Sequence, residues 1–228
     1  NLAIIVVPQD GEVFTPRTLR AIDALTEELW NLPYVRLVNS ITNFQNTYAD
    51  GDMMVVEDLV PEPSKVTNEV AAAVKKVALK RIEIQNSLIN KDGSATGISV
   101  IFRLPGMDLA SEIPNINAEA EPIFSRYRAE YPDIMFKVSG SVAISQAFAT
   151  ASQKDGETLT PAMVLAMLII VGLLLRSATG SFLILIVAAL SAMVSLGALG
   201  WTGIPINSAT AIAPLMVITL AVASSVHV

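Results

Sequence analysis

GIPINSATAIAPLMVITLAVASSVHV, residues 203–228, is the stretch that decides the fold. Most of it is apolar enough for a membrane-spanning helix. The exceptions are residues that interrupt or polarise such a helix: Asn207, Pro214, Ser224, Ser225 and His227, the only histidine of the chain. Polar and titratable groups are costly in hydrocarbon, so within a span they usually face a bundle interior or a water path. This stretch therefore predicts a membrane helix with a working role.

Charge divides the rest of the chain into two parts. Residues 1–157 hold 14 of the 15 basic and all 21 acidic residues, whereas Arg176 is the only charged residue that follows. This distribution predicts a soluble domain at 1–157 and a membrane domain at 158–228. The acidic balance of the first part argues against nucleic acid as a partner, because phosphate contacts need clustered basic side chains. The absence of cysteine excludes disulfides and thiolate metal sites.

Three apolar segments follow the soluble domain, and we expect three helices at 159–175, 182–204 and 205–228. Arg176 lies in the loop between the first two, and the positive-inside rule makes that loop cytoplasmic. Residues 1–157 then lie on the outer side. The chain starts without methionine and stops within an apolar helix, so we expect it to be a piece of a longer protein.

The soluble part alternates strand-like and helix-like patterns. Thr15 and Pro16 give a cap and a first-turn proline for the first helix. The polar residues 42–52 predict a turn. Expected strands are 2–7, 34–41, 98–104 and 134–138, and expected helices are 15–31, 64–88 and 116–130. The order β-α-β, helical insert, β-α-β predicts an α+β ferredoxin-like sandwich with helices on one face of an antiparallel sheet.

Catalytic chemistry finds no support in the soluble part. A Ser-His or Cys-His pair cannot form there, because His227 is the only histidine and cysteine is absent. Gly93 and Gly97 make no nucleotide-binding motif. The acidic pairs Glu27/Glu28 and Glu57/Asp58 are adjacent in sequence and point apart. We therefore expect no enzyme, cofactor or metal, and interpret a basic cluster at 75–81 as a solvated helix face rather than a ligand site.

The polar residues of the membrane part have two interpretations. Small residues of the second span, Gly197 among them, allow close helix packing. Asn207 can cap the third span, Pro214 can kink it, and the hydroxyls of Ser224 and Ser225 can bond back to carbonyls. His227 is either a proton or ion relay acting with Ser224, or a packing, capping or chain-end residue.

Several stretches resemble a known transporter superfamily. GEVFTPRTLRAIDAL, LPYVRLVNSITN, MVVEDLV, LLLRSATGSF and GWTGIPINSATAIAPLMVITLAVASSVHV together resemble the resistance-nodulation-division (RND) exporters, above all the membrane protein large (MMPL) and hydrophobe/amphiphile efflux branches. The resemblance implies a periplasmic porter domain followed by helices 2 to 4 of a twelve-helix transporter in the bacterial inner membrane. It implies export of lipids or hydrophobic molecules driven by the proton gradient, a trimer or dimer, and possible periplasmic accessory proteins.

One position departs from that pattern. Related members carry an acidic proton carrier in the last of these helices, in a motif like GVADSVH. The acid falls on Ser224 here, while Ser225 and His227 match. Either His227 replaces the acid, or the coupling residues lie in another part of the protein. The alternative function is a non-transporting membrane protein of the same fold that senses lipid or sterol.

Overall fold

The computed structural model divides the chain into two compact units, Asn1–Ala147 and Phe148–Val228. It describes residues 1–85, 87–106, 109–203, 210 and 212–226. The charge pattern predicts the change from soluble to membrane sequence at residue 157. Positions 147 and 157 lie on the same unbroken helix, α4 (Ser141–Leu175), whose sequence becomes apolar only in its second half.

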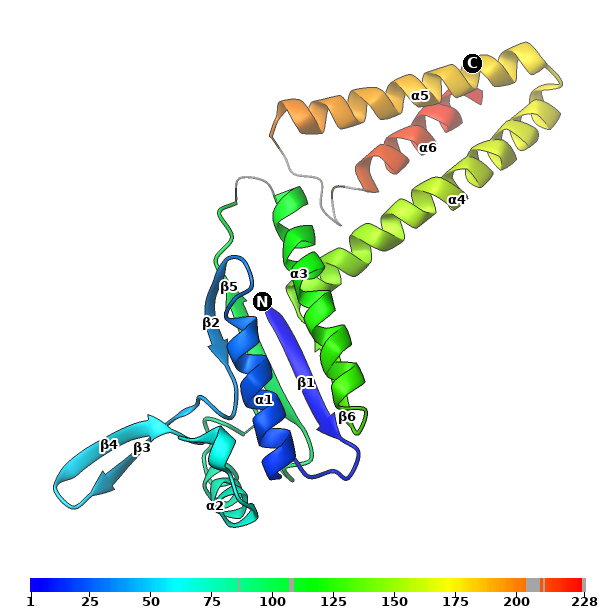
Figure 1. The fold of residues 1–228 in the computed structure, drawn as a ribbon. Coiled ribbons are helices and arrows are strands. Elements are labelled where there is room, and N and C mark those ends of the chain that lie inside the picture. Colours follow the sequence, from blue (N-terminus) through cyan, green and yellow to red (C-terminus); the bar gives the residue numbers. More distant parts are fainter. Residues whose placement is uncertain (86, 107–108, 204–209, 211, 227–228) are drawn as a thin grey trace. The chain divides into compact units, whose positions relative to one another are not determined.

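The first unit is built on a four-stranded sheet with the order β2-β5-β1-β6 (Figure 1). All neighbouring strands are antiparallel, and Ile4 lies opposite both Ile98 and Val138 in the register. The two central strands therefore come from distant parts of this unit's sequence. The strands are β1 (Leu2–Pro8), β2 (Val35–Asn39), β5 (Thr96–Phe102) and β6 (Ile134–Ser139).

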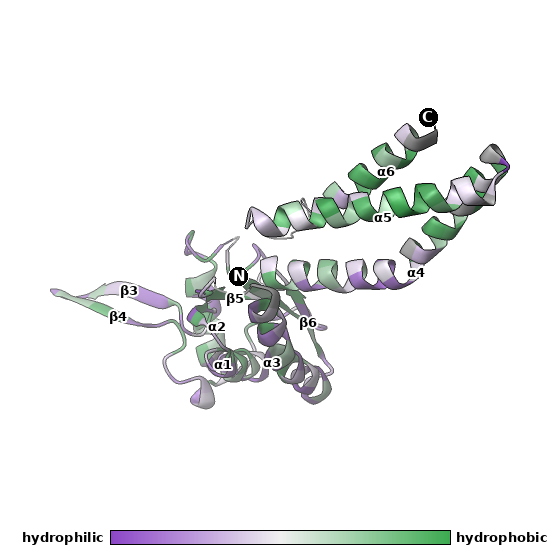
Figure 2. Ribbon diagram, turned by 90° about the horizontal axis from the view of Figure 1, so that it is seen from above, coloured by the Kyte–Doolittle hydropathy of each residue, from purple (hydrophilic) through white to green (hydrophobic). Residues whose placement is uncertain are grey.

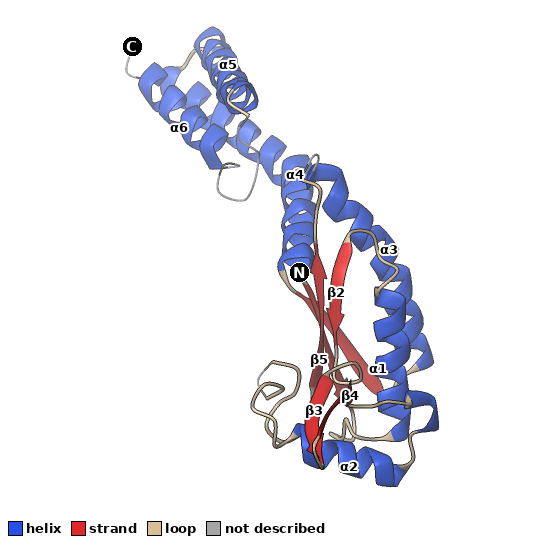
Figure 3. Cartoon of the chain, turned by 90° about the vertical axis from the view of Figure 1, so that its left-hand side faces the viewer, coloured by secondary structure: helices blue, strands red, loops and turns tan. Residues whose placement is uncertain are grey.

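Two helices, α1 (Pro16–Leu29) and α3 (Leu109–Glu130), run along one face of this sheet (Figure 3). Leu2, Ile4 and Val6 are every second residue of β1, so their side chains point to the same face of the sheet, and all three are buried. The apolar stripe of α1 meets them with residues at helical spacing: Leu19, Ile22, Leu25 and Leu29, all buried. The core of the first unit lies between the sheet and these helices.

Residues 42–52, which the sequence predicted to be a turn, instead begin a β-hairpin. Its strands are β3 (Gln45–Asp50) and β4 (Met53–Asp58), paired in an antiparallel two-stranded sheet. The two-residue loop between them is Gly51-Asp52, and Gly51 has φ of +60°, a conformation that glycine adopts readily at the first loop position of a tight hairpin. Strand β3 was not predicted because its residues are mostly polar and do not alternate with apolar ones.

The helix predicted at 64–88 is much shorter. A 3-10 turn, η1 (Pro63–Lys65), precedes α2 (Asn68–Ala78), and the side chain of Thr67 caps α2 by accepting a hydrogen bond from the Val70 N–H. After Ala78 the chain forms turns, and Ile84 returns to the core with no exposed surface. The apolar residues beyond position 78 therefore belong to a loop that packs on the core, and the prediction that the helix continues to residue 88 was wrong.

The second unit consists of apolar helices: the end of α4, then α5 (Ala178–Trp201) and α6 (Ile212–Val226). Two of them, α4 and α5, are long and apolar enough to cross a membrane, with mean hydropathies of 1.8 and 2.6 over their most apolar windows. Figure 2 shows α5 and α6 mostly in the hydrophobic colour, whereas the first half of α4 mixes hydrophilic and hydrophobic colours.

The third expected span, 205–228, is described only in part. At about 1.5 Å per residue, the 15 residues of α6 extend for about 22 Å, less than the ~30 Å of a bilayer core. Residues 204–209, 211 and 227–228 lie outside the described residues.

A tight turn joins α4 to α5, as the RSATGS stretch predicted. Arg176 occupies the left-handed region with φ of +51°, and Ser177 caps α5 by accepting a hydrogen bond from the Gly180 N–H at 3.2 Å. Ser181 Oγ donates to the Ser177 carbonyl at 2.9 Å. A Cβ on Gly172 would lie 3.4 Å from this Oγ, so a small residue lets α4 approach α5 here.

Candidate functional site: an apolar groove between α5 and α6

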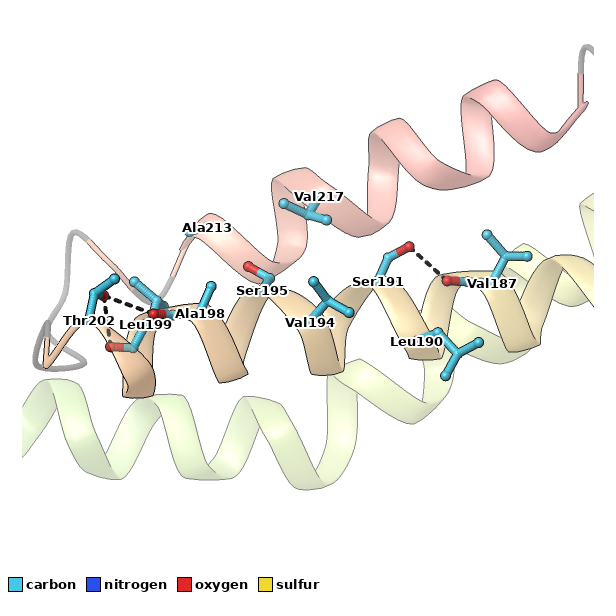
Figure 4. A pocket seen from close by; sticks show the side chains of 10 residues that line it. All are labelled: Val187, Leu190, Ser191, Val194, Ser195, Ala198, Leu199, Thr202, Ala213 and Val217. Atoms are coloured by element: carbon cyan, nitrogen blue, oxygen red, sulfur yellow. Dashed lines mark hydrogen bonds between the residues drawn. The ribbon is translucent and has the colours of Figure 1, made fainter.

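Helices α5 and α6 pack against each other and leave an open groove of about 710 Å³ (Figure 4). Small and branched side chains of α5 form most of its wall, and two residues of α6 complete it. The lining residues are Val187, Leu190, Ser191, Val194, Ser195, Ala198, Leu199, Thr202, Ala213 and Val217. The α5 residues recur at intervals of three and four, so they share one face of the helix.

Most hydroxyl groups of this region bond back to their own helix. Ser191 Oγ donates to the Val187 carbonyl at 2.8 Å, and Thr202 Oγ1 donates to the Ala198 carbonyl at 2.8 Å (Figure 4). On α6, Thr219 Oγ1 donates to the Leu215 carbonyl at 2.8 Å. Such bonds satisfy the polar hydrogens without a partner helix. The groove is therefore apolar in character despite its serine and threonine residues.

Among the described residues, those that line the groove include no titratable side chain. Contacts available to a ligand are dispersion and hydrophobic contacts along the valine, leucine and alanine side chains, with Ser195 as a polar point between the two helices (Figure 4). An apolar ligand fits such a surface, and acid-base chemistry does not.

The residues singled out in the sequence fall at different places. Ser224 is exposed near the end of α6, two turns after Val217 and on the same stripe of the helix. Pro214 lies in the first turn of α6, where a helix has no internal partner for the missing N–H. Gly197 is an exposed residue of α5, and a Cβ there would meet no described atom within 4 Å.

The three other candidates lie at the end of the described chain or outside it. Ser225 belongs to the last turn of α6. Asn207 and His227 lie outside the described residues. The predicted relay of His227 with Ser224 therefore stays a prediction.

Most of the groove was not predicted as a site. In the sequence, Ser191 and Ser195 indicated only close helix packing. The available signal was the recurrence of small residues at positions 191, 195, 198 and 202, which marks one face of α5. What the sequence could not provide was the second wall, because residues on α6 reach that face only through tertiary contact.

The acidic residues of the first unit take part in separate interactions. Glu28 forms an ion pair with Arg126, and Glu57 accepts a hydrogen bond from the Tyr48 hydroxyl at 2.9 Å. Partial burial, together with the charge of Glu27, raises the pKa of Asp23, although a hydrogen bond from Thr42 opposes this. The Arg17 guanidinium lowers the pKa of Asp133 by hydrogen bonding to it. Across the described residues, no group of three or more His, Cys, Asp or Glu could hold a metal ion.

Comparison with known protein families gives a match over most of the chain. A family model described as the MMPL family matches residues 8–226, from the end of β1 to the end of α6. The match thus covers both units. No curated protein matches the chain.

Proposed function

The chain belongs to the MMPL family, and from this membership we propose that it is part of a secondary active exporter that moves lipids or hydrophobic small molecules across a membrane. The family and the two apolar helices make it a membrane protein. The observation that carries the transport proposal is the apolar groove between α5 and α6. Its volume, about 710 Å³, lies within the roughly 300–1,000 Å³ range of small-molecule sites.

The first unit is the porter domain of this exporter in our proposal. The strand order β2-β5-β1-β6, with the two halves β1-α1-β2 and β5-α3-β6, is what a ferredoxin-like sandwich requires. The single Arg176 in the α4–α5 turn supports a bacterial inner-membrane orientation with residues 1–157 on the periplasmic side. Accessory proteins on that side, and a dimeric or trimeric assembly, belong to the same proposal.

The proton gradient is the proposed source of energy. The described residues that line the groove carry no titratable side chain, so the proposed coupling uses groups other than these residues. Within the sequence, His227 together with Ser224 and Ser225 is the candidate relay. The proposed activity needs no bound cofactor and no enzymatic step.

One observation favours a second candidate. Ser224 stands where related exporters place an acid, and a serine cannot release a proton at physiological pH. A protein that binds lipid or sterol without coupled transport would have no need of that acid. The groove would then be a sensing site rather than part of a transport path.

Filling the groove tests the proposal. Ala198→Phe places an aromatic ring in the groove, whereas Met193→Phe adds the same ring to an exposed position of α5 that does not line it. Gradient-driven movement of a fluorescent lipid analogue would be measured with the full-length protein in proteoliposomes. We expect Ala198→Phe to slow transport about tenfold and Met193→Phe to leave it near the unmodified rate, since blocking a site removes roughly 1.4 kcal/mol or more of favourable interaction.

The same assay separates the two candidates. Exporter function requires that collapse of the proton gradient stops lipid movement. Equal lipid binding with and without a gradient, and no movement in either case, would favour the sensor. Unaltered transport in Ala198→Phe would remove the groove from the mechanism.

A further inference from the structure

The hairpin formed by β3 and β4 is the least protected element of the first unit. Only Asn46 and Val55 of its strands are partly covered, while Met53 and Met54 are 69% and 76% exposed. Figure 1 shows it extending away from the four-stranded sheet. A lone two-stranded hairpin is marginally stable in water, and its strand edges are open to pairing. This hairpin therefore has the features of a docking element.

The hairpin is held at its base rather than hanging freely. The Arg81 guanidinium donates hydrogen bonds to Asn46 Oδ1 at 2.8 Å and to the Thr47 carbonyl at 2.6 Å. The backbone N–H of Leu59 donates to the Phe44 carbonyl at 2.7 Å. These bonds fix the direction of the hairpin relative to the chain that follows α2, so docking would cost little ordering entropy.

The chemistry of the hairpin is acidic and apolar. No lysine or arginine occurs between Arg36 and Lys65. Met54 and Val56 are two residues apart on β4 and therefore share a face. The hairpin carries four carboxylates, on Asp50, Asp52, Glu57 and Asp58. A complementary surface must offer an apolar contact with basic side chains around it.

Such a surface lies at the end of α2. Lys76 and Lys80 are exposed, and Ile82 is 83% exposed. We name these three residues the basic strip. Lys75, by contrast, forms an ion pair with Glu12. Among the described residues, the ion pairs include neither Lys76 nor Lys80. The strip thus has the charge and the apolar side chain that the hairpin requires.

Arg81 places the acidic hairpin and the basic strip next to each other within one chain. A surface with adjacent patches of opposite charge is complementary to itself, because a two-fold rotation sets each patch against the other patch of its copy. We propose that the chain forms a two-fold dimer in which the hairpin of each copy lies on the basic strip of the other. An anionic membrane surface is a poor alternative occupant, since it would repel four carboxylates.

Cross-linking tests the placement directly, because the chain has no cysteine of its own. Two differently tagged full-length chains would be co-expressed, one with Met54→Cys and the other with Ile82→Cys. Mild oxidation should give a disulfide-linked dimer that carries both tags. The matched control replaces Met54→Cys by Met135→Cys, a half-exposed methionine on β6, and should give no such band. Equal bands in both experiments would overturn the proposed contact.

Charge reversal tests the attraction. Asp50→Lys with Asp52→Lys, or Lys76→Glu with Lys80→Glu, should each weaken dimerisation of the detergent-solubilised full-length chain by about tenfold or more. Mixing a chain that carries the hairpin reversal with one that carries the strip reversal should give a mixed dimer with two attractive contacts, one between the unaltered hairpin and the unaltered strip and one between the two reversed patches. Lys91→Glu, a reversal outside both patches, should have no effect. Light scattering over a concentration series gives the dissociation constants.

Three results would contradict the dimer: a monomer at every concentration, reversals without effect, or sensitivity of the hairpin alone. The last result would instead indicate a basic protein partner. The proposal does not depend on transport, because assembly is measured without a gradient. A failed transport assay and a failed dimer are thus distinguishable.

Discussion

Gly140 shows how much a single residue position can depend on distant backbone. It follows β6 with φ of +102°, and a Cβ there would lie 2.8 Å from the Asn1 carbonyl oxygen and 3.1 Å from the Ala3 nitrogen. The turn between β6 and α4 thus passes against the start of β1, which has paired with β6. In the sequence, Gly140 only follows the strand expected at 134–138. The need for glycine arises from both its conformation and this close approach.

Gly140→Ala should destabilise the first unit by about 3 kcal/mol, the sum of left-handed strain of about 1–2 kcal/mol and overpacking of about 1–3 kcal/mol. Gly106→Ala is the matched control, because Gly106 also has positive φ, +74°, but a Cβ added there would meet no described atom within 4 Å. It should cost only about 1 kcal/mol. Thermal unfolding of the full-length chain in detergent gives both values. Equal losses in the two variants would show that the backbone contact at Gly140 is unimportant.

The start of α1 is the helix boundary that the sequence predicted best, whereas α2 begins at Asn68 rather than at 64 and α3 begins at Leu109 rather than at 116. Thr15 Oγ1 accepts from the Thr18 N–H at 3.1 Å, and it also donates to Thr18 Oγ1 at 2.9 Å. Pro16 follows at the first position of the helix. These signals are local, so the pattern of the sequence contains them in full. Strand β3 is mostly polar and has no alternation of apolar residues, so the local pattern did not predict it and the hairpin was missed.

Thr15→Ala should reduce the stability of the first unit by about 1 kcal/mol, because it leaves the Thr18 N–H without its capping oxygen. Thr67→Ala is the comparison, since Thr67 caps α2 through a longer hydrogen bond of 3.3 Å on an exposed site. We expect a smaller loss there. Thr15→Ser retains the hydroxyl and should recover most of the stability in the same unfolding measurement. A loss in Thr15→Ser equal to that in Thr15→Ala would argue against capping.

At the scale of the whole molecule, the two units differ in what they are made of. The first has a buried core between sheet and helices, whereas α5 exposes Leu183, Leu190 and Val194 among other large apolar residues. Exposed apolar surface of this extent is suited to lipid rather than water. The apolar helices of the second unit therefore belong in a membrane, and Arg176, the only Lys, Arg, Asp or Glu after residue 157, orients them in our proposal.

Thiol labelling checks that orientation. Lys91→Cys lies at an exposed position of the first unit, and Thr179→Cys lies at an exposed position just after the Arg176 turn. A membrane-impermeant maleimide should label Lys91→Cys in intact cells and Thr179→Cys only after permeabilisation, because the positive-inside rule keeps Arg176 cytoplasmic. The cysteine-free chain is the background control. Labelling in the opposite order would reverse the proposed topology.

The sequence by itself determined the features whose signals lie close together along the chain. These are the division into charged and apolar parts, the strands around Ile4 and Ile98, the capped start of α1, and the tight turn at Arg176. Each of these features depends on hydropathy or on hydrogen bonds within a few residues, so the local sequence is enough to predict it.

Tertiary structure alone decided which segments meet. It placed β1 between β5 and β6, folded residues 45–58 into a hairpin beside Arg81, and set Val217 of α6 across from the small residues of α5. The physical reason is that sheet order, the contact of the hairpin with Arg81 and the second wall of a groove are set by packing between segments that lie apart in the sequence. Such packing has no counterpart in local spacing.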